Sequence, residues 1–121
     1  MPKQGLVTLA RREEFTWEPI ETASGTFRIT RPFDSRNCPT VGGGICELNA
    51  AEMAWTPNYD EIVTVLSGEL VIEHSGTELT ARMGDMVLIR YGAEIVYRSR
   101  TKCAFSWVLS PANWKSLRWP E

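Results

Sequence analysis

Histidine, the side chain that most often binds transition metals, occurs once in this 121-residue chain, at His74. Cysteine is also scarce: Cys38, Cys46 and Cys103 are an odd number and form no C-x-x-C pair. Such a set matches neither a disulfide framework nor a structural zinc site. The sequence therefore predicts a protein without a bound metal, and no cofactor is predicted.

Strong charge of either sign and long apolar runs are missing as well. The formal net charge is −2, and no basic tail or stripe is present, so neither nucleic acid nor an anionic membrane surface is expected as a partner. Uninterrupted apolar runs are as short as MVLI (86–89), far below the length of a membrane span. The opening residues contain no stretch typical of a signal peptide. We therefore expect a soluble, cytoplasmic protein.

The chain does contain many short segments with strand-like alternation, separated by turns such as Ser67-Gly68 and Ser75-Gly76. No segment has a long helical period. This pattern predicts an all-β sandwich or barrel, and the length predicts a single domain over residues 1–121. Its expected parts are an N-terminal arm (1–24), the barrel (about 26–109) and a C-terminal segment (110–121). The predicted strands are residues 26–30, 45–49, 59–66, 69–74, 78–81, 86–90, 94–100 and 103–109, and residues 31–44 are predicted to form a loop.

Glu61 is the most informative residue. In a strand over residues 59–66, Tyr59, Glu61, Val63 and Val65 share one face, because side chains alternate across a strand. The valines indicate that this face points inward. A buried carboxylate costs several kcal/mol unless it is paired, hydrogen-bonded, metal-bound or protonated. Glu61 is therefore either a ligand-binding or acid–base group in a barrel lumen, or a structural carboxylate satisfied by Tyr or Arg; both interpretations stay open.

Two sequence blocks, DEIVTVLSGEL (60–70) and ARMGDMVLIRYGAEIVY (81–97), resemble the two signature motifs of cupins. Six residues separate Glu61 from Gly68, as in the first motif, and the glycines of the second motif are matched. The resemblance implies a small antiparallel β-barrel, or jelly roll. It also implies a lost metal site, because only the glutamate of the usual three-histidine, one-glutamate ligand set remains. Counted back from Glu61, the first two histidine positions fall at Trp55 and Pro57, or one residue earlier in the longer variant of the motif, and Ile95 stands at the third.

A rebuilt oxygen site for a divalent metal is an alternative that the sequence leaves open. Oxygen donors suit hard cations better than the transition metals that imidazole selects. The candidate ligands are Asn58, Asp60, Glu61 and Glu94.

The runs WTPNYDE (55–61) and PANW (111–114) narrow the resemblance to the cupin domain of the ethanolamine-utilisation protein family EutQ, over residues 43–116. That resemblance implies that the missing histidines are a family trait. It further implies a role in ethanolamine metabolism and its bacterial microcompartment, an associated acetate kinase activity, and a homodimer.

The parity of Glu61, extended across the barrel, predicts the residues around a small-molecule ligand. Glu61 and Tyr59 are the expected polar contacts, and Trp55, Tyr97 and Trp107 the expected walls, although Trp107 would also serve simply to fill the barrel. A second acidic residue, Glu94, is the candidate partner of Glu61 in a catalytic acid–base pair, because like charges held close together raise one pKa.

Three functions are compatible with these features. The first is binding of a small polar metabolite in the lumen, with weak or accessory enzymatic activity. The second is a structural dimer whose barrel is filled by side chains. The third is phosphoryl transfer, as the family resemblance implies, although the sequence has neither a P-loop nor an evident magnesium cage. The tryptophans at 114 and 119 predict that the C-terminal segment packs on the barrel or across a dimer.

Overall fold

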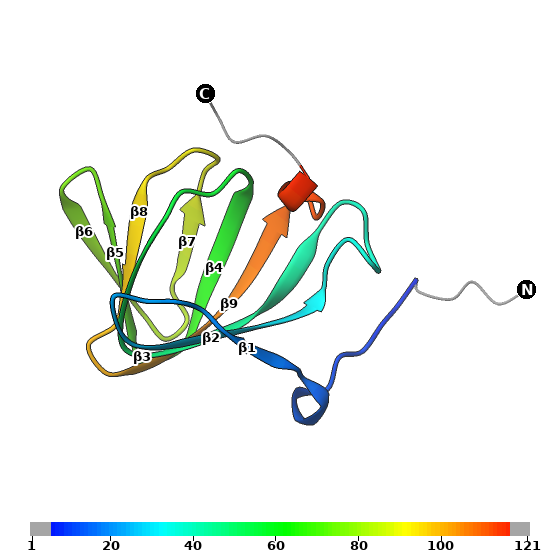
Figure 1. Ribbon diagram of the computed structural model, residues 1–121, viewed down its shortest axis with the longest axis horizontal. Helices are drawn as coiled ribbons and strands as arrows, with labels where there is room; N and C mark the ends of the chain where they lie inside the picture. The colour runs from blue at the N-terminus through cyan, green and yellow to red at the C-terminus, as the bar shows by residue number, and fades with distance from the viewer. Residues whose placement is uncertain (1–5, 117–121) are drawn as a thin grey trace, which may run out of the picture.

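Alternation of apolar and polar residues arranges nine strands into a nearly closed antiparallel barrel in the computed structural model, which describes residues 6–116 (Figure 1). The all-β prediction is therefore confirmed. The strands are β1 (Trp17–Pro19), β2 (Ser24–Phe33), β3 (Gly42–Trp55), β4 (Asp60–Ser67), β5 (Glu69–His74), β6 (Thr77–Arg82), β7 (Met86–Ile89), β8 (Ile95–Arg98) and β9 (Lys102–Ser110). Two short 3-10 helices flank them, η1 (Arg12–Glu14) and η2 (Trp114–Ser116).

Strand β3 joins the two halves of the barrel. Residues 42–49 pair with β9 and residues 52–55 pair with β8, so the strand passes from one half of the single nine-stranded sheet to the other. The bend falls at Ala50, which has a φ of 50°. Gly25 of β2 lies beside this bend, where an added Cβ would come within 2.1 Å of the Ala50 carbonyl oxygen. The resulting strand order is β6-β5-β8-β3-β9-β4-β7, with β2 on the other edge of β3 and β1 next to it.

Each predicted strand overlaps an observed one, but β1 was not predicted, and β3 continues to Trp55, beyond the predicted end at residue 49. The predicted loop over residues 31–44 is shorter, because β2 continues to Phe33 and β3 begins at Gly42. The glycines at 42–44 form part of a strand rather than a loop. At Gly44 an added Cβ would lie 1.9 Å from the Thr30 carbonyl oxygen and 2.7 Å from the Trp107 ring. A strand rich in glycine thus permits close packing of β2 and of Trp107 against β3.

The core occupies the barrel lumen. Along β4, Glu61, Val63 and Val65 are buried while Ile62 and Leu66 are exposed, which is the alternation expected of a barrel strand. The largest apolar side chains of the lumen belong to strands from both halves of the barrel. They include Phe27, Leu48, Leu70, Ile72 and Phe105. Among residues 6–116, no helix has the length and apolar character needed to cross a membrane.

Candidate functional site

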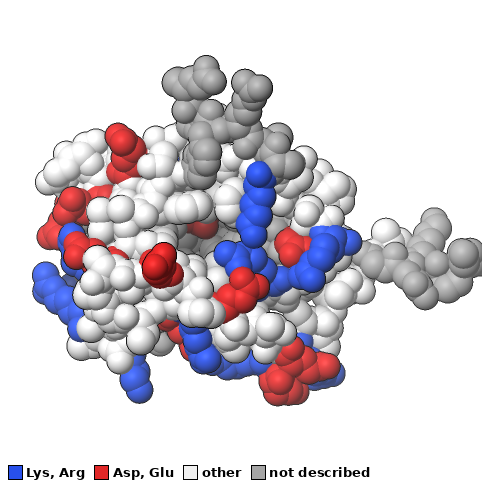
Figure 2. Space-filling model, in the orientation of Figure 1, with Lys and Arg blue, Asp and Glu red and all other residues white. Residues whose placement is uncertain are grey.

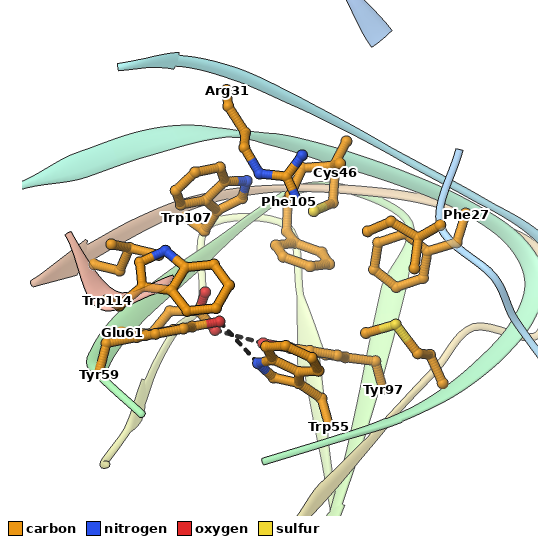
Figure 3. Close-up of a pocket in the computed structure, with 14 residues that line it drawn as sticks. Phe27, Arg31, Cys46, Trp55, Tyr59, Glu61, Tyr97, Phe105, Trp107 and Trp114 are labelled. Carbon is orange, nitrogen blue, oxygen red and sulfur yellow. Dashed lines mark hydrogen bonds between the residues drawn. The ribbon is translucent and has the colours of Figure 1, made fainter. Parts of the chain in front are cut away.

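One end of the lumen contains a cavity of about 170 Å³, which we call the lumen cavity (Figure 3). It is larger than an engineered cavity of about 150 Å³ that holds one benzene molecule. The barrel is therefore not completely filled. The interpretation as a structural dimer had expected side chains to fill it. Half of the residues in its wall are aromatic: Phe27, Trp55, Tyr59, Tyr97, Phe105, Trp107 and Trp114.

The carboxyl group of Glu61 is the acidic group in the wall. Glu61 projects inward from β4 and is only 5% exposed. The Tyr97 hydroxyl, from β8, donates a hydrogen bond to its Oε1 atom. Burial raises the pKa of Glu61 to about 7, and the hydrogen bond from Tyr97 acts in the opposite direction. The carboxyl group thus changes its charge near neutral pH, which is the property needed in a general acid or base.

A second polar pair lies on the neighbouring wall. The indole N–H of Trp55 donates a hydrogen bond of 2.8 Å to the Tyr59 hydroxyl oxygen. Burial, followed by the negative charge of Glu61, raises the pKa of Tyr59 well above its ordinary value. Tyr59 therefore stays protonated, and because its oxygen accepts from Trp55, its hydrogen is oriented for donation elsewhere. The structure thus brings together the five expected ligand-binding residues, Trp55, Tyr59, Glu61, Tyr97 and Trp107, around one cavity.

Arg31 and Cys46 also line the cavity and were not predicted from the sequence. Arg31 belongs to β2, and its Nη1 atom lies 3.0 Å from Oε2 of the exposed Glu18. The positive charge of Arg31 lowers the pKa values of Cys46 and Tyr59, although burial dominates and leaves both raised. Residue 31 was placed in a loop, whereas the inward alternation of Phe27 and Ile29, extended by two residues, would have found it.

Glu94 does not reach the cavity. It is exposed in the turn before β8, and its backbone carbonyl accepts a hydrogen bond of 3.0 Å from Nδ1 of His74. Because the neighbouring Ile95 and Tyr97 point inward, residue 94 faces the other way. The expected convergence of Glu61 and Glu94 is therefore wrong.

The four oxygen ligands considered for a rebuilt metal site do not converge either. Asp60 faces outward and accepts hydrogen bonds from Arg90 Nε at 3.3 Å and from the Tyr91 backbone N–H at 2.9 Å. The amide of Asn58 donates to the backbone carbonyl of Trp114 at 2.8 Å. Across residues 6–116, no group of three or more His, Cys, Asp or Glu side chains is arranged to hold a metal ion.

The C-terminal segment closes the cavity on one side. Trp114 of η2 meets Tyr59 edge-on, with ring centroids 5.0 Å apart, and meets Trp55 edge-on at 6.0 Å. The prediction that this segment packs on its own barrel is confirmed for Trp114. Trp119, for which the same was expected, lies outside the described residues.

Residues 19–116 match the family described as ethanolamine utilisation protein EutQ. The chain belongs to this family. Acetate kinase EutQ of Salmonella typhimurium is 38% identical over 78 residues, which are 64% of this chain and 34% of that protein. Acetate kinase EutQ of Clostridioides difficile is 33% identical over 84 residues, which are 69% of this chain and 54% of that protein. The chain thus spans a third to a half of the length of these relatives.

Solved structures agree with this assignment. The crystal structure of an ethanolamine utilization protein EutQ from Salmonella typhimurium superimposes with a TM-score of 0.83 at 29% identity, covering 93% of this chain and 91% of that one. The EutQ protein of Clostridium difficile gives 0.75 at 30% identity, covering 79% and 78%. An RmlC-like cupin from Shewanella frigidimarina gives 0.72 at 14% identity, covering 89% and 94%, and so shows the fold alone. The cupin prediction is confirmed.

Proposed function

We propose that this EutQ-family cupin binds a small polar metabolite in the lumen cavity, with Glu61 holding or releasing a proton beside it. The observation that carries the proposal is a buried carboxyl group with a pKa near 7 in the wall of an aromatic cavity. Such a group destabilises the fold when it ionises, so a binding role gives a reason for its presence. Membership of an ethanolamine utilisation family supports ethanolamine or a related small metabolite as the ligand.

The cavity volume restricts the ligand. A space of about 170 Å³ suits a molecule about as large as benzene. Acetate, ethanolamine and glycerol are within this limit, whereas a nucleotide is much too large for the lumen. The aromatic walls would contact the carbon atoms of such a ligand, and Tyr59 and Glu61 its polar atoms.

Thermal unfolding with acetate, ethanolamine and glycerol tests the proposal. A ligand at about 100 times its dissociation constant raises the free energy of unfolding by about 2.7 kcal/mol. We expect one of these probes to stabilise the wild-type protein at about pH 6, where Glu61 is protonated. At that pH Glu61→Gln should bind the probe about tenfold more weakly, which lowers the stabilisation by about 1.4 kcal/mol. Glu94→Gln is the matched control, because that carboxyl group lies outside the cavity. Equal responses of the two variants, or no response of the wild-type protein, would contradict the proposal.

Phosphoryl transfer is a second candidate, supported by the acetate kinase names of the relatives. A polar basin adjoins the lumen cavity and shares Arg31 with it; its other cationic lining residues are Arg11, Arg36 and Lys115. Figure 2 shows such side chains gathered on this face with acidic ones among them, and Glu14, Glu18 and Asp34 also line the basin. A nucleotide would bind there rather than in the lumen. Incubation with ATP, magnesium and acetate, followed by measurement of acetyl phosphate, tests phosphoryl transfer. Absence of acetyl phosphate would rule this function out.

A homodimer is the partner that we propose. On the outer face of the barrel, Ile62 of β4 lies opposite Leu88 of β7 and Val108 of β9, and these side chains are 43%, 62% and 50% exposed. An apolar face of this kind suits burial against a second copy. We expect Leu88→Lys to convert the dimer into a monomer, as measured by sedimentation. Leu79→Lys, at an exposed apolar side chain of β6, should leave the dimer unchanged. A wild-type monomer at micromolar concentration would contradict the dimer.

A further inference from the structure

A buried hydrogen-bond donor belongs to Trp107, in the wall of the lumen cavity. The indole N–H of Trp107 is inaccessible to solvent and has no hydrogen-bond partner among residues 6–116. The Cys46 sulfur, a weak acceptor, lies close enough for the indole to lower the pKa of the Cys46 thiol, whereas no oxygen or nitrogen acceptor is within reach among these residues. A buried donor without an acceptor costs free energy, so each such group in a folded protein needs an explanation. An acceptor atom supplied by a bound ligand would explain the unpaired indole N–H of Trp107.

A cation lines the same cavity as this donor. The guanidinium group of Arg31 uses Nη1 to reach Glu18, and its remaining N–H groups can donate further hydrogen bonds. The Arg31 side chain is 24% exposed and lines the lumen cavity, so it connects the cavity with the surrounding solvent. In Figure 3 the Arg31 guanidinium and the Trp107 ring nitrogen lie on the same side of the cavity, away from the Glu61–Tyr97 hydrogen bond, and both residues act on the pKa of the Cys46 thiol.

The two donors select the kind of acceptor. A neutral indole donor next to a guanidinium favours an oxygen atom with negative charge, because charge-assisted hydrogen bonds are the stronger ones. We propose that Arg31 and Trp107 form an oxyanion subsite, which binds the anionic oxygen of a small carboxylate or phosphate at the end of the cavity opposite Glu61. This inference rests on the proposed lumen-binding function and adds the class of ligand and the residues that select it.

The subsite also assigns an orientation to the ligand. With its anionic oxygen on Arg31 and Trp107, the rest of a small molecule extends between the aromatic walls toward the other end of the cavity. There the Tyr59 hydroxyl and the Glu61 carboxyl group remain available to a second polar atom. Arg31 and Trp107 thus determine specificity for the ligand, whereas Glu61 binds or releases a proton beside it.

The indole N–H signal of Trp107 in a ¹H–¹⁵N NMR spectrum reports directly on the subsite, and the variant Trp107→Phe identifies that signal. We expect titration with acetate or inorganic phosphate to shift this signal, whereas acetamide, which has the shape of acetate without its charge, shifts it much less. A response to acetate alone assigns the ligand as a carboxylate, and a response to phosphate alone assigns it as a phosphate. Both responses support the subsite.

Two pairs of variants complete the experiment. Arg31→Met should weaken binding of the effective anion by at least about tenfold, because a charge-assisted hydrogen bond is lost. Arg90→Met is its control, since Arg90 pairs with Asp60 on the outer face. Trp107→Phe should also weaken binding, whereas Trp17→Phe, which lies outside the cavity beside Arg28, should not.

The wild-type titration alone can overturn the inference, even if a variant fails to fold. The subsite is wrong if acetate and phosphate leave the Trp107 signal unmoved, or if Arg31→Met and Arg90→Met bind the anion equally well. If acetamide or glycerol shifts the indole signals of other cavity tryptophans while the anions shift none, the lumen binds a neutral ligand, so the proposed function stands and the subsite falls. If none of the probes shifts any signal, the proposed function fails together with the subsite.

Discussion

Tyr97 and Glu61 are joined by a hydrogen bond across the barrel, from a phenol on β8 to a buried carboxyl group on β4. Burial raises the pKa of Glu61 to about 7, and the bond from Tyr97 limits the rise. Because the charge of Glu61 changes near neutral pH, both the stability of the fold and the chemistry of the cavity should depend on pH.

The first prediction concerns the free energy of unfolding. In the unfolded chain Glu61 ionises near 4.5, whereas in the folded protein it holds its proton up to about pH 7. The folded state therefore binds more protons between these values, and the contribution of Glu61 to stability falls as the pH rises through this window. The loss is complete above pH 7 and amounts to about 3 kcal/mol.

Urea denaturation at several pH values measures this loss. Glu61→Gln should remove most of the decrease between about pH 5 and pH 8, because the amide cannot ionise. Glu94→Gln should keep the decrease of the wild-type protein, since Glu94 is exposed. An unchanged pH dependence in Glu61→Gln would mean that Glu61 does not hold its proton in the fold.

The second prediction concerns Tyr97→Phe, which removes the hydrogen-bond donor but keeps the ring. We expect the pKa of Glu61 to rise further, because the bond stabilises the ionised carboxylate. The pH window in which stability is lost should then extend upward, and the protein should lose about 1 kcal/mol or more at a pH where Glu61 is ionised. Tyr91→Phe, at an exposed phenol, is the control. A window that stays where it is in the wild-type protein would show that the bond does not act on Glu61.

The inward position of Glu61 could be predicted from the sequence because strand parity is a local rule. Val63 and Val65 identify the buried face, and every second residue of β4 follows them. The same rule contradicts the pairing of Glu61 with Glu94, since Ile95 is inward and its neighbour cannot be.

Arg31 was missed because its strand depends on a long-range partner. Residues 31–44 contain proline, aspartate, asparagine and three glycines, which locally favour a loop. In the fold, β2 continues to Phe33 because it pairs with β3 up to Gly43. Local sequence preferences do not contain this pairing, and only the alternation of Phe27 and Ile29, extended through the apparent loop, would have placed Arg31 at the cavity.

The third prediction concerns Gly44, whose lack of a side chain lets the Trp107 ring and the Thr30 carbonyl approach β3. Gly44→Ala forces the strand and the ring apart, and such overpacking costs about 1–3 kcal/mol. Gly43→Ala is a matched control, because its added Cβ meets nothing nearer than 3.4 Å. Urea denaturation followed by tryptophan fluorescence measures both the stability and the displacement of Trp107. Equal stability of the two variants would show that the close approach at Gly44 is not required.

The last prediction connects the oxyanion subsite with Glu61. An anion in the cavity disfavours an ionised Glu61, so acetate should bind the protein in which Glu61 is protonated. Of the other titratable groups in the cavity wall, Tyr59, Tyr97 and Cys46 have raised pKa values and stay neutral. A guanidinium group is not deprotonated in proteins. Only Glu61 therefore changes its charge between about pH 6 and pH 8, and with a pKa near 7 its protonated fraction falls by about tenfold.

Acetate should accordingly bind about tenfold more tightly at about pH 6 than at about pH 8. Titration calorimetry at the two pH values measures this ratio, and acetate itself stays ionised at both. Glu61→Gln should bind acetate with the same affinity at both pH values, because the amide leaves no carboxylate to repel the anion. A ratio that persists in Glu61→Gln would show that another group controls the charge of the cavity.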